Sequence, residues 1–277
     1  ELLTCNEQTK VRILVDELEA INSERKQTQE EVHIQAREAA LLQLNDLSWK
    51  SLAEDLPASQ FGPWPRALVL APQEGAIWHE GVVGIVASKI VEEFHLPAIV
   101  LTHSHHGLKG SMRSLPSIDI LAQISAESVA SHLTNFGGHA HAGGLALPYS
   151  SLEDFRKALN LHMALTLDET HYKREMRYDL ELDLAELSEQ LLVELEMLEP
   201  FGRGFAEPVF KIAHTKPIQY SLMKEKHLKL RIGKSLRNHS YDAVWFNAIG
   251  PRGFANVSDV KQISQGCALW VTPQWNE

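Results

Sequence analysis

Two short glycine-rich clusters within residues 107–147 constrain most strongly what this chain can fold into. The first reads GLKGSMRS from Gly107, and the second reads NFGGHAHAGGLAL from Asn135. Glycine has no Cβ and tolerates positive φ, so a Gly-Gly-His turn lets the backbone approach a ligand closely. Successive exposed N–H groups in such a turn form a concavity that binds anions. The sequence therefore predicts an anion-binding turn in the second cluster.

A phosphate-binding wall is the interpretation that these clusters favour. Its expected members are Gly137 and Gly138 with His139, and Arg113, whose guanidinium suits forked contacts with phosphate. His79 comes just before a predicted helix, whose first N–H groups and positive dipole end also attract phosphate. Each feature alone is as well explained by an ordinary turn or a solvated side chain. The order of the segments, with WHEGVVGIVASKI upstream, favours the functional reading.

The pattern of apolar runs predicts an α/β domain. An apolar strand at 67–71, a helix at 81–94 and a second strand at 98–102 form a β-α-β unit with a parallel pair. Short strands at 108–112 and 145–147 and helices at 118–132 and 152–165 follow. Residues 1–56 contain neither Gly nor Pro, and apolar residues at helical spacing predict an amphipathic helix there. That helix either packs on its own domain or connects it to another, and the connector is the favoured reading.

The composition changes after about residue 167. An acidic helix is expected at 184–198, followed by short strands at 209–212, 218–222, 227–232, 241–247 and 267–272. Many short strands separated by turn residues suggest a small β-barrel.

Charge is segregated in this second half, although the formal net charge of the chain is −10. Residues 202–239 carry nine Lys or Arg against two Glu, a sum of +7, and residues 168–199 carry three bases against eleven acids, a sum of −8. Lys229 and Arg231 alternate with apolar residues, which predicts a half-buried strand with a basic outer face. Trp245 and Arg203 are the further candidates for binding a single strand, since such surfaces combine cations with stacking rings. A merely solvated face is the alternative.

Several function classes are excluded or disfavoured. The two cysteines, Cys5 and Cys267, lie near opposite ends without metal-type spacing, which favours a reducing compartment and a cytoplasmic location. No signal peptide or membrane-spanning run is visible. The histidines of THSHHG lack neighbouring aspartates, so they predict a solvated loop, and no metal site is expected in this chain. Because the sequence begins at Glu1 without methionine, we expect it to be a fragment.

Four motifs resemble one known family. WHEGVVGIVASKIVEEFHLPAIVLT, GLKGSMRS and FGGHAHAGGLAL are similar to the DHH-associated domain of RecJ-type single-strand-specific exonucleases, and EPFGRGFAEPVF with HLKLRI resembles their OB-fold domain. The implied architecture is a connector helix at 1–56, a mixed-sheet DHH-associated α/β domain at 57–166, and an acidic helix plus small OB-type β-barrel at 167–277. This sequence departs from the family pattern at Met112, at Gly143 and at Phe205-Ala206.

The resemblance implies the C-terminal half of a 5′→3′ single-stranded DNA exonuclease of DNA repair and recombination. His139 with the Gly137 and Gly138 backbone would close the active site. The residues implied to hold a backbone phosphate are Arg113, Ser111, Ser114 and His79. Mn²⁺ or Mg²⁺ would be bound by a DHH domain that is missing here, so this chain alone is expected to be inactive.

Single-stranded DNA is the implied partner, and a single-strand-binding protein is a further candidate. Two other functions stay open. Related domains in alanyl-tRNA synthetases bind RNA, which suggests a catalytically inert nucleic-acid-binding module. A phosphoesterase for oligoribonucleotides or cyclic dinucleotides is the other alternative, and five strands after residue 200 would argue against it because such enzymes lack the OB barrel.

Overall fold

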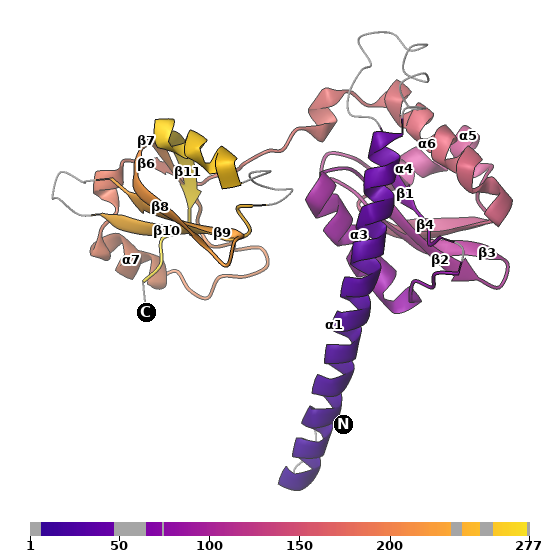
Figure 1. Cartoon of the computed structure of the whole chain (residues 1–277), viewed down its shortest axis with the longest axis horizontal. Helices are drawn as coiled ribbons and strands as arrows, with labels where there is room; N and C mark the ends of the chain where they lie inside the picture. Colours follow the sequence, from indigo (N-terminus) through magenta and orange to yellow (C-terminus); the bar gives the residue numbers. More distant parts are fainter. Residues whose placement is uncertain (1–6, 47–64, 74, 234–239, 250–256, 276–277) are drawn as a thin grey trace. The chain divides into compact units, whose positions relative to one another are not determined.

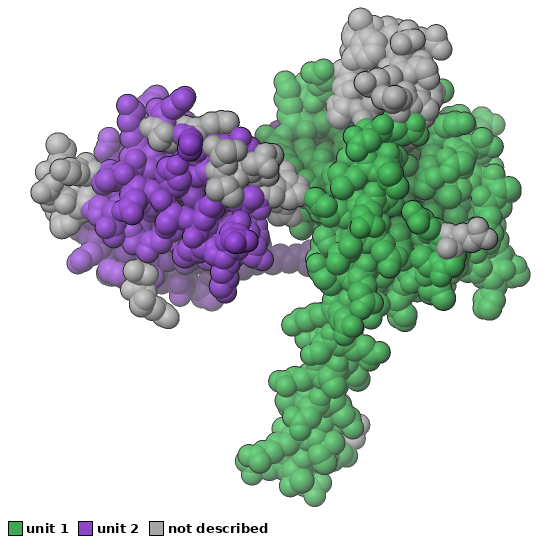
Figure 2. Space-filling model, viewed as in Figure 1, with its two compact units in different colours: residues 1–174 green, residues 175–277 purple. Residues whose placement is uncertain are grey.

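The computed structural model describes residues 7–46, 65–73, 75–233, 240–249 and 257–275. The chain forms two compact units, Glu1–Arg174 and Glu175–Glu277, which Figure 2 colours separately. The domain limits inferred from the sequence place the second boundary at 166/167, a few residues before this division. The first limit, at 56/57, lies outside the described residues.

Unit 1 begins with the long helix α1, Gln8–Asn45 (Figure 1). Residues 1–6 and 47–56 of the expected helix lie outside the described residues. Only Val32, Ala36 and Ala40 are buried among the residues of α1, so just its C-terminal half packs on the domain, against α3 and β1. Three large apolar side chains of the N-terminal half are exposed, namely Ile13, Leu18 and Ile21. The role of connector remains a prediction.

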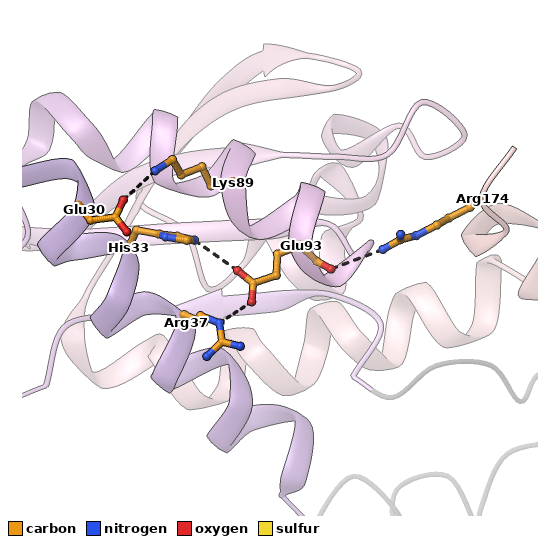
Figure 3. Close-up of polar contacts among 6 residues, drawn as sticks. All are labelled: Glu30, His33, Arg37, Lys89, Glu93 and Arg174. Atoms are coloured by element: carbon orange, nitrogen blue, oxygen red, sulfur yellow. Dashed lines mark hydrogen bonds and ion pairs between the residues drawn. The ribbon is translucent and has the colours of Figure 1, made fainter. Parts of the chain in front are cut away.

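Polar contacts hold α1 against helix α3, Glu80–Phe94 (Figure 3). Glu93 of α3 pairs with Arg37 and, at 3.4 Å, with His33 of α1, and its carbonyl accepts a 3.5 Å hydrogen bond from Arg174. Lys89 pairs with Glu30 at 3.1 Å. Burial, and then the nearby Lys89 ammonium, lower the pKa of His33 below its ordinary value despite the carboxylate of Glu93. Desolvation thus outweighs the ion pair at this imidazole.

The described strands of unit 1 form one mixed sheet, as expected, with a fifth strand, β4, that the sequence did not predict. They are β1 Leu68–Leu70, β2 Ala98–Ser104, β3 Gly107–Arg113, β4 Asn135–His139 and β5 Ala142–Leu147, in the order β1-β2-β3-β5-β4. β1 and β2 are parallel and joined through α3, which confirms the predicted β-α-β unit. All other pairs are antiparallel, and β4 is an edge strand.

Three further helices and two 3-10 turns complete the described part of unit 1. The single helix expected at 118–132 is wrong: two helices occur, α4 Ile120–Ser125 and α5 Glu127–Ala130, because Ala126 between them is extended at φ −59° and ψ 134°. The long helix α6, Leu152–Thr166, follows the 3-10 turn η3, Tyr149–Ser151, and precedes η4, Glu169–Tyr172. Apolar residues of β3, β5 and these helices share one core, namely Leu108, Met112, Leu145, Leu147, Ile120, Ile124, Phe155 and Leu159.

Unit 2 contains two three-stranded sheets. The first has the order β10-β9-β8, from Tyr241–Trp245, His227–Ile232 and Pro217–Met223, and the second the order β11-β7-β6, from Cys267–Val271, Phe210–Thr215 and Leu180–Leu182. The five strands β7–β11 follow residue 200, as an OB-type domain requires. A 3-10 segment η6, Val257–Gln265, lies beside a small core that includes Leu228, Leu230 and Val260.

The acidic helix of unit 2 is shorter than the sequence suggested. A 3-10 turn η5, Leu184–Glu186, is followed by helix α7, Glu189–Glu196. Ser188 divides them, because its extended backbone precedes the helix and its hydroxyl accepts a hydrogen bond from the Leu191 N–H at 3.2 Å. An N-terminal serine cap starts a new helix at this position.

Candidate nucleic-acid interface

Three neighbouring strands of unit 1 present one polar face. Strand register places Arg113 of β3 opposite Ala142 of β5, which lies opposite His139 of β4. Two further rows run parallel to this one, and their members are Ser111, Gly144 and Gly137, then Lys109, Ala146 and Asn135. Since side chains alternate between the sides of a sheet, all nine residues lie on the same side. We call this set the polar face.

Arg113 and His139 are therefore brought together although 25 residues separate them in the sequence. Both flank Ala142, and His139 is exposed on the edge strand. The Arg113 guanidinium donates a 2.8 Å hydrogen bond to the carbonyl of Met112, and no ion pair holds it among the described residues. A cation with most of its donors uncommitted next to an exposed imidazole can bind a phosphate group.

The Gly-Gly-His segment is a strand and not the predicted anion-binding turn. Gly137, Gly138 and His139 all pair with β5, because their extended backbone continues the antiparallel ladder. Gly138 has φ 149°, and a Cβ added there would lie 2.4 Å from the Gly143 Cα. A Cβ at Gly137, by contrast, would meet nothing within 4 Å. One glycine thus makes the hairpin possible, and the other leaves its surface open.

Helix α3 lies beside the polar face, and this proximity explains the glycine at position 84 of the helix. A Cβ at Gly84 would lie 3.1 Å from Arg113 Nη2 and 3.3 Å from Ser111 Oγ, so this glycine makes room for both side chains. His79 was expected to bind a phosphate at the start of this helix. In the structure its Nδ1 accepts a 3.1 Å hydrogen bond from the Gly81 N–H, so His79 caps the helix. Trp78 is buried and donates to Gln35 of α1 at 2.9 Å, which makes it a core residue.

A cavity of about 590 Å³ opens over part of the polar face. Its lining includes Lys109 and Ser111 of β3, Asn135 and Gly137 of β4, and Glu80 at the start of α3, but not Arg113, His139 or His79. The small residues Gly144 and Ala146 form its floor. A volume of this size accommodates a small organic ligand or one nucleotide. The predicted residues Ser111 and Gly137 therefore lie inside the cavity, with Arg113 and His139 one row beyond it.

Ser114 is less well placed than the other expected phosphate ligands. It follows the last residue of β3, and its N–H donates to the carbonyl of His141 at 3.1 Å. Its hydroxyl is buried and has no hydrogen-bond partner within the described part of the chain. A phosphate could reach this hydroxyl only after a local rearrangement.

The second candidate surface is the sheet of β8, β9 and β10 in unit 2. The predicted alternation is present, since Leu228, Leu230 and Ile232 are buried while Arg231 is exposed and Lys229 half-buried. The solvent side of this sheet, which we call the outer face, comprises Gln219, Ser221, Met223, His227, Lys229, Arg231, Asp242 and Val244.

Asp242 is the member of the outer face that the sequence did not reveal. Its carboxylate pairs with Lys229 at 2.9 Å and with Arg231 at 3.2 Å. The hydrogen bonds from Lys229, then those from Arg231, lower the pKa of Asp242. The cations of this strand are thus already matched by an acid, which a charge count along the sequence cannot show.

The aromatic residue on the outer face is Phe246, and not Trp245. Trp245 lies opposite the core residue Leu228, on the other side of the sheet from Lys229 and Arg231, and is 40% exposed. The Phe246 ring is 68% exposed and contacts His227 edge to face, with 5.5 Å between the ring centroids. The Nδ1 of His227 accepts a 2.9 Å hydrogen bond from the Asn247 N–H, which orients this pair. Phe246 directly follows β10, so the segment predicted as a strand at 241–247 contains both aromatic rings.

Arg203 lies in an exposed turn that Gly202 and Phe205 close with two backbone hydrogen bonds. No contact within the described residues joins it to the outer face. Over the same residues, no group of three or more His, Cys, Asp or Glu side chains could hold a metal ion. None of the helices described is long and apolar enough to cross a bilayer.

Comparisons with known proteins match both units. The DHHA1 domain matches residues 67–164, and the RecJ OB domain matches residues 178–277. The chain is 31% identical over 250 residues to the single-stranded-DNA-specific exonuclease RecJ of Escherichia coli, which covers 89% of this chain and 40% of that protein. It is 32% identical over 235 residues to RecJ of Thermus thermophilus, covering 83% and 30%.

Comparison with solved structures also finds RecJ proteins. The crystal structure of Thermus thermophilus RecJ with Mg²⁺ has a TM-score of 0.61 at 26% identity and covers 83% of this chain and 32% of that one. The complex with Mn²⁺ has a TM-score of 0.62 at 25% identity, with 87% and 34% covered. The chain is thus a DHHA1 domain followed by an OB-type domain. Its two domains match the DHHA1 and RecJ OB domain families, it is similar to RecJ proteins over both, and it spans 40% of the length of the Escherichia coli protein.

Proposed function

We propose that this chain is the C-terminal, substrate-binding part of a RecJ-like 5′→3′ exonuclease that hydrolyses single-stranded DNA. The observation that supports the proposal is the row Arg113–Ala142–His139, in which a cation and an imidazole flank the small residue Ala142 on one sheet face. Relatives named as single-stranded-DNA-specific exonucleases support the same substrate. The five strands after residue 200 favour this function over a small-substrate phosphoesterase.

In this proposal the polar face holds the DNA backbone near the reacting phosphodiester. Arg113 and Ser111 bind a phosphate, and His139 donates a hydrogen bond where negative charge develops during hydrolysis. Because Gly137 has no side chain, the DNA strand can come close to the backbone of β4 at this position. His79 acts through the start of α3, which it caps, and Ser114 supports the end of β3 beside Arg113.

The outer face of unit 2 supplies a second surface that binds the strand. Lys229 and Arg231 neutralise phosphates, and Phe246 offers a ring on which a base can stack. We assign Trp245 to the edge of the core of unit 2, on the side of Leu228. We assign Arg203 to a contact with the strand at a separate turn. A polar groove with one stacking ring binds strands of many sequences.

The solved relatives contain Mg²⁺ or Mn²⁺, and we propose that the full-length enzyme binds such ions in a domain outside this chain. Two divalent ions would activate water and stabilise the leaving oxygen. The proposal assigns the metal ligands to that other domain, and the described residues of this chain include no group of three or more His, Cys, Asp or Glu side chains that could hold a metal ion.

Binding measurements on this chain test the proposal. Fluorescence anisotropy with a labelled single-stranded oligonucleotide should show binding that weakens steeply with salt, without hydrolysis in Mn²⁺ or Mg²⁺. Arg113→Ala should weaken binding more than Arg25→Ala, which removes the same charge from the exposed part of α1. Equal affinities for both variants would contradict the role of the polar face. EDTA-sensitive nucleotide release by the purified chain would contradict the assignment of catalysis to another domain.

A further inference from the structure

An ion pair crosses the cavity over the polar face. Lys109 Nζ lies 2.6 Å from Glu80 Oε2, and both residues line the cavity. The two side chains remain 41% and 66% exposed, so water reaches both. Glu80 belongs to the first turn of α3, where the helix dipole stabilises a carboxylate even without a cationic partner.

Lys109 lies in line with the proposed phosphate ligands. It occupies the row next to Ser111, and Arg113 occupies the row after that. Alternate residues of a strand are about 6.6–6.8 Å apart, which is of the same order as the repeat of an extended nucleic-acid backbone. Beside Ser111, the residues of β5 and β4 that line the cavity here are the small residues Gly144, Ala146 and Gly137, so only the serine hydroxyl, itself a proposed phosphate ligand, stands between the two cationic positions.

The ion pair between Lys109 and Glu80 is weak. An exposed ion pair contributes little to stability, because the two charges are well solvated when apart. A phosphodiester placed in the cavity can therefore replace the Glu80 carboxylate at Lys109. Glu80 then stays next to the bound anion and opposes it.

We propose that Lys109 binds a second backbone phosphate, next to the one at Ser111 and Arg113, and that Glu80 is its built-in competitor. This inference rests on the proposed function, since it extends the same strand-binding face. The cavity then accepts a strand with at least two linked phosphates, and Glu80 lowers its affinity. A loosely held strand can advance after each cleavage, which an exonuclease requires.

Three variants of the whole 277-residue chain test the competition, with labelled single-stranded oligonucleotide and anisotropy at several salt concentrations. Glu80→Gln should raise affinity by up to about fivefold, which is the range of an exposed ion pair. Lys109→Ala should lower affinity and reduce the salt slope by about 0.7, the value for one phosphate contact on a single strand. In Lys109→Ala, the added Glu80→Gln change should give a clearly smaller gain, because the two residues act as a pair.

Glu127→Gln is the matched control, because Glu127 is an exposed acid in the first turn of another helix of unit 1. It should leave affinity unchanged. If Glu80→Gln gains no more than Glu127→Gln, or if Lys109→Ala leaves affinity and slope unchanged, the inference is wrong. In that case a loss of binding in Arg113→Ala would still leave the proposed function standing, whereas an unchanged Arg113→Ala would contradict both.

Discussion

The polar face of unit 1 and the outer face of unit 2 hold their arginines in opposite ways. Arg113 donates to a backbone carbonyl and has no acidic partner among the described residues, whereas Lys229 and Arg231 share the carboxylate of Asp242. Both segments look basic or polar in sequence. The comparison shows that the register of neighbouring strands decides whether an arginine keeps its donors for a ligand or shares them with an acid.

The two faces also differ in what lies beneath them. Much of the polar face consists of glycine and alanine, and these small residues let a ligand approach the backbone closely. The outer face carries long side chains over a core of Leu228, Leu230 and Ile232. We therefore expect the first to act at the reacting group and the second to supply affinity.

The sharpest test of this division is His139→Ala in the full-length enzyme. Turnover should fall by about 10²–10³-fold, the usual loss when one donor to a developing charge is removed. Affinity for the strand should change little, because the outer face still binds it. His105→Ala, in the exposed turn between β2 and β3, is the control for loss of a histidine. Near-normal turnover in His139→Ala would reduce the polar face to a simple binding surface.

Alanine at the two adjacent glycines should separate folding from binding on the polar face. Gly138→Ala should lower the free energy of unfolding by about 1–3 kcal/mol or more, because φ 149° is strained for alanine and its Cβ meets β5. Gly137→Ala should leave the melting temperature nearly unchanged and weaken strand binding, since its methyl group enters only the cavity. Thermal unfolding beside anisotropy measures both, and normal binding by Gly137→Ala would mean that the strand avoids this floor.

Phe246→Ala and Trp245→Ala should separate stacking from packing on the outer face. Loss of the Phe246 ring should cost binding of about 1–3 kcal/mol, the usual contribution of one stacked base, without changing stability. Trp245→Ala should instead lower the melting temperature, because Trp245 lies on the side of Leu228. The opposite pattern, with binding lost only in Trp245→Ala, would restore the sequence-based choice.

The smallest expected effect concerns Asp242. Asp242→Asn should raise strand affinity modestly, because it frees Lys229 and Arg231 for phosphates. The double variant Lys229→Ala, Arg231→Ala should weaken binding to many sequences equally and reduce the salt slope by about 0.7 per lost contact. Titrations at several salt concentrations measure both, with Glu194→Gln on α7 as the charge-matched control for Asp242→Asn. Unchanged slopes would mean that the outer face is only solvated.

Much of the architecture followed from the sequence. The β-α-β unit was predictable because its elements are local and strongly apolar, and the alternation from Leu228 to Ile232 identified a half-buried strand. The motifs around His79, Arg113 and His139 were sufficient to indicate the family. Local breaks were missed at Ala126 and at Leu187 and Ser188, where non-helical backbone interrupts a helical pattern.

The sequence by itself determined the order of the two domains and supplied the candidate residues for the chemistry. Only the tertiary structure decided which of those residues meet. Strand register aligned Arg113 with His139, matched Lys229 with Asp242 and placed Trp245 on the far side of its sheet. The reason is that a strand shows its own alternation in sequence, whereas its pairing partner is set by hydrogen bonds between segments that are distant along the chain, and a shift of one residue would exchange the two faces.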